Sequence, residues 1–101
     1  MINYKYEEEK IVALYLADLL EDRKAKELLE SGVVSSSEEA TYLSKFFWKM
    51  VELSEEENRR SLGIPCKGNA QFWTEKLYNT FGGYLESIGY EDEWSREIDD
   101  A

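Results

Sequence analysis

The chain has 101 residues, 43% of them hydrophobic, with 22 Asp and Glu against 12 Lys and Arg for a formal net charge of −10, and no histidine. This charge disfavours direct binding to nucleic acid, whose phosphates would repel it, and favours a basic protein partner. The missing histidine removes the commonest general base and the commonest metal ligand.

A helical pattern is predicted along most of the chain, because it has one proline and no stretch alternates apolar and polar residues over strand length. The first helix is expected from about Tyr6 to Glu30, with an apolar centre at Ile11–Leu20. The charged segment 21–24 leaves open whether a turn or a break interrupts it. Gly32 is expected to end it in a left-handed conformation.

Two capping patterns are expected to start helices in the middle of the chain. Ser36 followed by Glu39 fits the capping box, in which each side chain satisfies an amide of the first turn. Ser54 followed by Glu57 repeats this pattern. It predicts a separate short helix to about residue 62, which the Gly63–Pro65 segment ends.

The last helix is expected from an Asn69 cap to Gly89, with the pair Gly82 and Gly83 inside it. Each glycine costs a helix interior roughly 0.5 to 1 kcal/mol relative to alanine. A kink, a close approach of another helix, or a true break between two short helices would each explain the pair.

These elements predict an all-α fold. We expect a small compact bundle of three main helices and a short fourth segment over residues 1–90. Residues 91–101 form an acidic tail, which could pack back through Trp94. The spacing of apolar residues predicts a core made of Leu16, Leu19, Leu43, Phe47, Met50, Leu77, Phe81 and Leu85.

The sequence offers no candidate catalytic, cofactor-binding or metal-binding residues, so we expect no enzyme activity and no cofactor. Without histidine, a serine or cysteine nucleophile lacks its usual base. Cys66 stands beside Lys67, whose charge favours a thiolate, but a bystander thiol is the simpler interpretation. The single cysteine, and a polar N-terminus without the features of a signal peptide, suggest the cytoplasm.

Adjacent aromatic residues cannot all face one core, so Trp48 and one of the pair Phe72 and Trp73 are expected near the surface. Residues 69–101 contain eight acids and two bases, for a net charge of −6, which points to the tail as the docking site of a basic partner. The predicted partner-binding residues are Glu91, Asp92, Glu93, Trp94, Glu97, Asp99, Asp100 and Trp48.

These properties favour a non-catalytic inhibitor that binds a basic protein, namely a nuclease or a nucleic-acid-binding effector. Such a protein could offer carboxylates where phosphates would sit, as a phage counter-defence factor of the anti-CRISPR or anti-restriction type. One alternative is an immunity protein that neutralises a nuclease toxin. Another is a regulatory or structural helical subunit that associates with itself through exposed aromatic residues.

Overall fold

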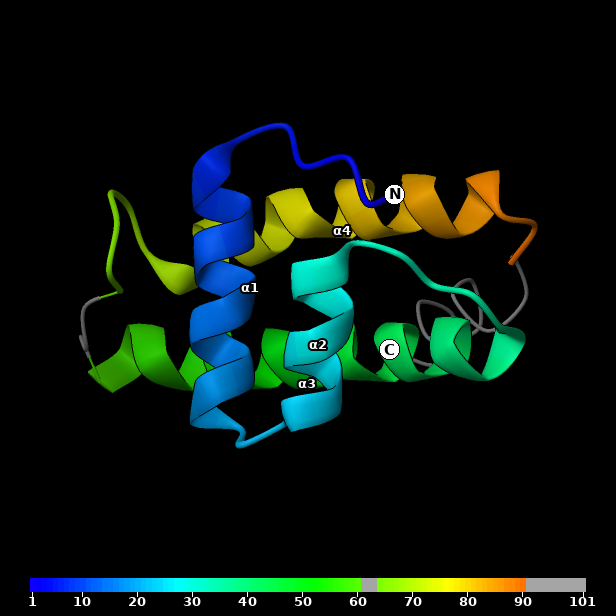
Figure 1. Ribbon diagram of the computed structural model, residues 1–101. Helices are drawn as coiled ribbons and strands as arrows, with labels where there is room; N and C mark the ends of the chain where they lie inside the picture. The colour runs from blue at the N-terminus through cyan, green and yellow to red at the C-terminus, as the bar shows by residue number, and fades with distance from the viewer. Residues whose placement is uncertain (61–63, 91–101) are drawn as a thin grey trace.

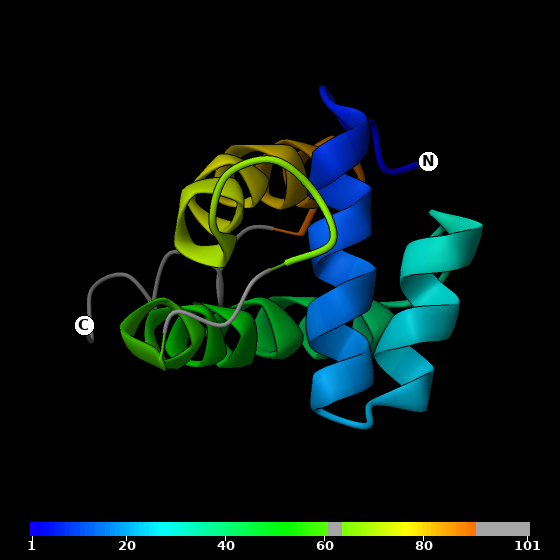
Figure 2. The same ribbon diagram turned by 90° about the vertical axis from the view of Figure 1, so that its left-hand side faces the viewer.

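The computed structural model describes residues 1–60 and 64–90, which form four α-helices and no strand. The helices are α1 (Glu7–Leu19), α2 (Arg23–Ser31), α3 (Ser37–Arg60) and α4 (Ala70–Ser87). Helices α1 and α2 make one antiparallel hairpin, which lies across a second antiparallel hairpin of α3 and α4 (Figures 1 and 2). The prediction of a compact all-α bundle is confirmed, with a radius of gyration of 12.7 Å.

The segment predicted as one helix from Tyr6 to Glu30 is two helices with a sharp turn between them. Glu21 at the turn has a positive φ of 54°, which is incompatible with a continuing helix. Asp22 then caps α2 by accepting a hydrogen bond from the Ala25 amide at 3.1 Å. The Tyr42 hydroxyl of α3 donates to the same carboxylate at 2.5 Å, and this hydrogen bond raises the pKa of Tyr42 to about 12.

The short helix predicted to begin at Ser54 does not exist, because α3 continues without a break to Arg60. Ser54 and Glu57 are both buried, on the side of α3 that packs against the rest of the protein. The Ser54 hydroxyl donates to the Val51 carbonyl at 2.8 Å and caps nothing. The fourth and shortest helix is therefore α2, not the C-terminal part of α3. The predicted end of that short helix falls in residues 61–63, outside the described residues.

The other helix ends follow the sequence signals. Gly32 ends α2 in the left-handed region with φ 71°, and the Asn69 side chain caps α4 by accepting from the Phe72 amide at 2.8 Å. At the start of α3, the Glu39 amide donates to the Ser36 hydroxyl at 3.2 Å, as the capping box predicts. The Glu39 carboxylate accepts from the Ser35 amide, not from the Ser36 amide, so the capping box is only half formed. Helix α4 runs unbroken through Gly82 and Gly83.

The core lies between the two hairpins, and seven of the eight residues predicted for it are buried: Leu16, Leu43, Phe47, Met50, Leu77, Phe81 and Leu85. The eighth, Leu19, is 45% exposed, so its prediction is wrong. It occupies the last turn of α1, which projects beyond α3 in both views (Figures 1 and 2). Helical spacing identifies the side of α1 that faces the core, but it does not show that α1 extends past α3 at this turn.

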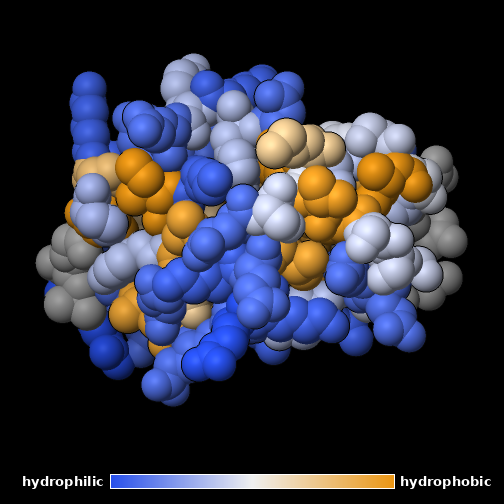
Figure 3. All heavy atoms as spheres, viewed as in Figure 1, coloured by the Kyte–Doolittle hydropathy of each residue, from blue (hydrophilic) through white to orange (hydrophobic). Residues whose placement is uncertain are grey.

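The N-terminal segment joins the two hairpins. The Ile2 amide donates to the Gly32 carbonyl at 2.6 Å, and the Tyr4 ring packs edge-on against Phe81 of α4 with centroids 6.4 Å apart. The face that carries α1 and α2 is mostly hydrophilic, with separate hydrophobic patches (Figure 3). Among the described residues, no helix combines the length and apolar character that crossing a membrane requires.

Candidate functional site

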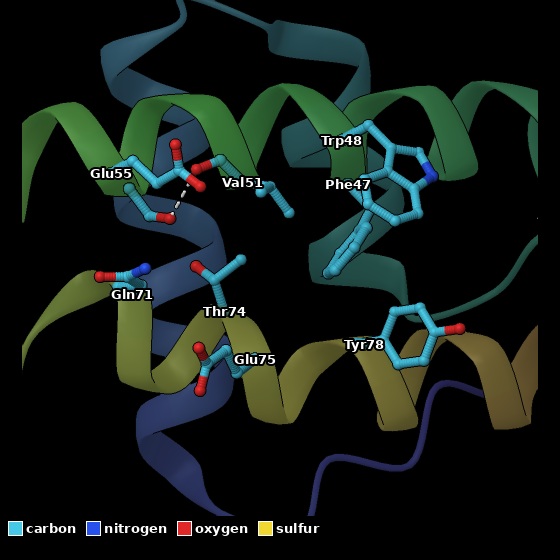
Figure 4. Close-up of a pocket in the computed structure, with 9 residues that line it drawn as sticks. Phe47, Trp48, Val51, Glu55, Gln71, Thr74, Glu75 and Tyr78 are labelled. Atoms are coloured by element: carbon cyan, nitrogen blue, oxygen red, sulfur yellow. Dashed lines mark hydrogen bonds between the residues drawn. The ribbon is translucent and has the colours of Figure 1, made fainter. Parts of the chain in front are cut away.

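A cavity of about 400 Å³ opens between α3 and α4, and we call it the α3–α4 groove. In the view of Figure 4, α1 and α2 lie behind these two helices. The groove is lined by Phe47, Trp48, Val51, Ser54, Glu55, Gln71, Thr74, Glu75 and Tyr78. Its volume is within the range of about 300 to 1,000 Å³ that is usual for ligand pockets in proteins. The antiparallel arrangement of α3 and α4 brings Trp48 opposite Tyr78 at one end of the groove, and it brings Glu55 and Glu75 together toward the other end. We call these the aromatic end and the acidic end.

Three aromatic side chains form the aromatic end (Figure 4). The Phe47 ring is buried and meets Trp48 edge-on, with centroids 5.1 Å apart, and Tyr78 at 5.8 Å. Trp48 and Tyr78, each half-buried, meet across the groove at 6.3 Å. Phe47 thus belongs to the core, whereas Trp48 and Tyr78 present part of their rings to the groove. Trp48 lies closer to the core than its sequence position suggested, but at a surface where a partner can reach it.

Two carboxylates from opposite helices mark the acidic end. Glu55 of α3 and Glu75 of α4 are both exposed and lie away from Trp48 and Tyr78 (Figure 4). Within residues 1–60 and 64–90, neither carboxylate has an ion-pair or hydrogen-bond partner, and no Lys or Arg lines the groove. The two ion pairs found there, Lys26–Asp18 and Arg60–Glu56, lie elsewhere.

A buried hydroxyl lies at the acidic end of the groove (Figure 4). Thr74 is 2% exposed, and its side chain rises from α4 toward α3 (Figure 4). Its Oγ1 atom has no hydrogen-bond partner in the described part of the chain. A buried polar atom without a partner costs about 1 to 3 kcal/mol. Near it, Gln71 already accepts a hydrogen bond from Asn58 at 3.2 Å. The groove therefore combines aromatic faces, unpaired carboxylates and an unsatisfied hydroxyl, which together suit the recognition of a cationic group with an apolar neighbour.

A second surface, the Tyr6–Phe72 patch, brings together aromatic residues from the start of α1 and the start of α4. Tyr6 is 51% exposed and Phe72 is 47% exposed, and the Lys76 ammonium lies 5.8 Å and 4.8 Å from their ring centroids. Trp73 is buried and donates from Nε1 to the Lys67 carbonyl at 2.6 Å. The prediction that one of Phe72 and Trp73 is exposed is confirmed. The sequence analysis did not identify Tyr6 as a surface aromatic residue, because Tyr6 and Phe72 come together only when the chain folds.

The remaining predicted partner-binding residues lie outside the described residues: Glu91, Asp92, Glu93, Trp94, Glu97, Asp99 and Asp100. Among the described residues, no group of three or more Cys, Asp or Glu could hold a metal ion.

Cys66 lies in the loop before α4 and is partly buried. Burial, followed by the nearby Glu8 carboxylate, raises the pKa of the Cys66 thiol, so the neutral thiol is favoured. The positive charge of Lys67 does not outweigh these two effects. The raised pKa of the thiol agrees with the interpretation of Cys66 as a bystander.

The sequence and the structure were compared with protein families, with curated proteins and with solved structures, and none of them matches this chain.

Proposed function

We propose that this chain is a non-catalytic cytoplasmic inhibitor that binds the basic surface of a nucleic-acid-handling protein, as a phage counter-defence factor of the anti-CRISPR or anti-restriction type. The observation that carries the proposal is the α3–α4 groove, which holds Glu55 and Glu75 at one end and partly exposed Trp48 and Tyr78 at the other. Carboxylates held near aromatic anchors suit a basic partner better than a nucleic acid or an acidic substrate.

Charge and aromatic residues have separate tasks in this proposal. The net charge of −10 attracts a basic surface from a distance and accelerates encounter. Trp48 and Tyr78 then lose their remaining contact with water, and burial of aromatic side chains at the centre of an interface supplies most of the binding energy in many complexes. By occupying the surface that otherwise holds phosphates, the bound protein excludes the nucleic acid.

The proposal is tested by capture followed by competition. The full chain is immobilised and exposed to lysate of the cells in which it acts, and the retained proteins are identified, purified and bound to a fluorescent DNA or RNA duplex. We expect a retained partner to release its duplex as the chain is added, seen as a fall in fluorescence anisotropy. A variant with Glu55→Lys and Glu75→Lys should release much less.

Three outcomes count against this proposal. A ternary complex of partner, duplex and chain would exclude competition for the phosphate-binding surface. Retention of proteins without nucleic-acid activity would exclude the partner class. Retention of a nuclease toxin encoded beside this chain would keep the mechanism but replace counter-defence with immunity.

A further inference from the structure

We infer that the acidic end of the α3–α4 groove takes an arginine side chain of the partner, with the guanidinium between Glu55 and Glu75 and an apolar neighbour of that arginine on Trp48 and Tyr78. This inference rests on the proposed function and specifies how the basic partner is recognised. In a nucleic-acid-handling protein, such an arginine would be one that otherwise contacts phosphate.

Charge complementarity identifies the ligand as a cation. Glu55 and Glu75 come from opposite helices to the same end of one groove, and no basic residue among residues 1–60 and 64–90 lines it. An ionised carboxylate only accepts hydrogen bonds, so a cation between the two side chains gains attraction from both. The same carboxylates would repel a phosphate, so a nucleic acid is a poor occupant of this groove.

The arrangement of acceptors favours arginine over lysine. A guanidinium carries five N–H donors in a planar fork and can bond two carboxylates on opposite sides at once. The Thr74 Oγ1 atom, which is buried and has no partner within the described part of the chain, can accept a further N–H. A lysine ammonium is a compact, strongly hydrated point charge, and it gains less from acceptors spread across two helices.

The length of the groove sets where the apolar neighbour lies. Glu55 and Trp48 are seven residues apart on α3, a rise of about 10.5 Å, whereas Glu75 and Tyr78 are three residues apart on α4, a rise of about 4.5 Å. Side chains two residues apart in an extended segment point to the same side. An arginine with leucine two positions away can therefore reach both ends of the groove.

The test uses the full chain, labelled with ¹⁵N, and three capped pentapeptides: Leu-Ala-Arg-Ala-Leu and its counterparts with lysine or citrulline at the centre. Citrulline has nearly the shape of arginine without its charge. Chemical shifts detect weak binding and locate it. We expect the arginine peptide to move the Trp48 indole and Thr74 amide signals and to bind most tightly, with lysine next and citrulline last.

A matched pair of variants isolates the two carboxylates. The double variant Glu55→Gln and Glu75→Gln should weaken binding of the arginine peptide about threefold to thirtyfold, since the two exposed ion pairs together contribute about 0.6 to 2 kcal/mol. The control double variant Glu38→Gln and Glu86→Gln removes the same charge from exposed positions of the same two helices. It should bind the peptide within about twofold of the wild type.

Equal affinity for the arginine and citrulline peptides would overturn the inference, and so would equal losses in the two double variants or shifts confined to other surfaces. These outcomes are distinct from failure of the proposed function. If the double variant Glu55→Gln and Glu75→Gln displaced the duplex from a nucleic-acid-handling partner as well as the wild type does, the proposed function would stand and the arginine site would be excluded. If the arginine peptide bound in the groove but no nucleic-acid-handling partner were found, the arginine site would stand and the proposed function would be excluded.

Discussion

Glu9 places a carboxylate inside the hydrophobic core, where it is 1% exposed. It accepts a hydrogen bond from the Tyr6 amide at 3.1 Å, which closes the first turn of α1, and a second one from the Thr80 hydroxyl of α4. A buried polar group remains compatible with folding only when its hydrogen bonds are satisfied. Glu9 therefore fixes how α1 sits on α4, and Thr80 is required to keep it there.

Two buried threonines on α4 allow this requirement to be tested with one substitution. Thr80→Val leaves the Glu9 carboxylate with one hydrogen bond fewer and should lower the free energy of unfolding by about 1 to 3 kcal/mol. Thr74→Val removes a hydroxyl that has no partner, so it should change stability by less than about 0.5 kcal/mol or increase it. Urea unfolding measures both variants. Equal losses in the two variants would show that the Thr80–Glu9 hydrogen bond adds no stability of its own.

At the scale of the elements, local signals predicted the helix ends well. Gly32 and Asn69 act through their own backbone or a neighbour three residues away, and both are found as expected. The Ser54–Glu57 pattern failed because the same residue types can be buried in mid-helix, where neighbours satisfy or surround them. The turn at Glu21 was left open because its positive φ depends on how α2 folds back on α1.

The glycines of α4 and α2 give a prediction at this scale. Gly83 is exposed in mid-helix and a Cβ there meets no atom within 4 Å, so Gly83→Ala should raise the free energy of unfolding by about 0.5 to 1 kcal/mol. Gly32 has φ 71°, and a Cβ there lies 3.3 Å from Met1 Cγ, so Gly32→Ala should lower stability by about 1 kcal/mol or more.

Thermal or urea unfolding of the two alanine variants shows whether α4 is continuous. If Gly83→Ala were destabilising, the backbone at Gly83 would not be helical in solution, and α4 would be broken at the glycine pair. The structure would then be wrong at this point.

At the scale of the whole molecule, the α3–α4 groove could not be read from the sequence. Trp48 was identified because it falls off the apolar stripe of its own helix. Thr74, Glu75 and Tyr78 join it only through the register between α3 and α4, which side-chain packing sets. Composition predicts the sign of the proposed partner's charge, whereas the fold determines where aromatic residues and carboxylates meet.

Our proposal is that charge steers this chain to a basic partner and that aromatic residues hold it there. It is tested most directly by the binding kinetics of the partner purified as above, measured at 0.1 M and 1 M salt, where the Debye length falls from about 10 Å to about 3 Å. Three proteins are compared: the wild type, Trp48→Ala, and a tail variant with Glu91→Gln, Asp92→Asn and Glu93→Gln.

The account predicts that salt and the tail variant chiefly slow association, whereas Trp48→Ala chiefly speeds dissociation. Trp48→Ala should associate at nearly the wild-type rate, because it changes no charge. Association that is unchanged by salt and by the tail variant, together with dissociation that is unchanged by Trp48→Ala, would contradict the claim. The charge would then serve solubility, and the groove would not be the docking site.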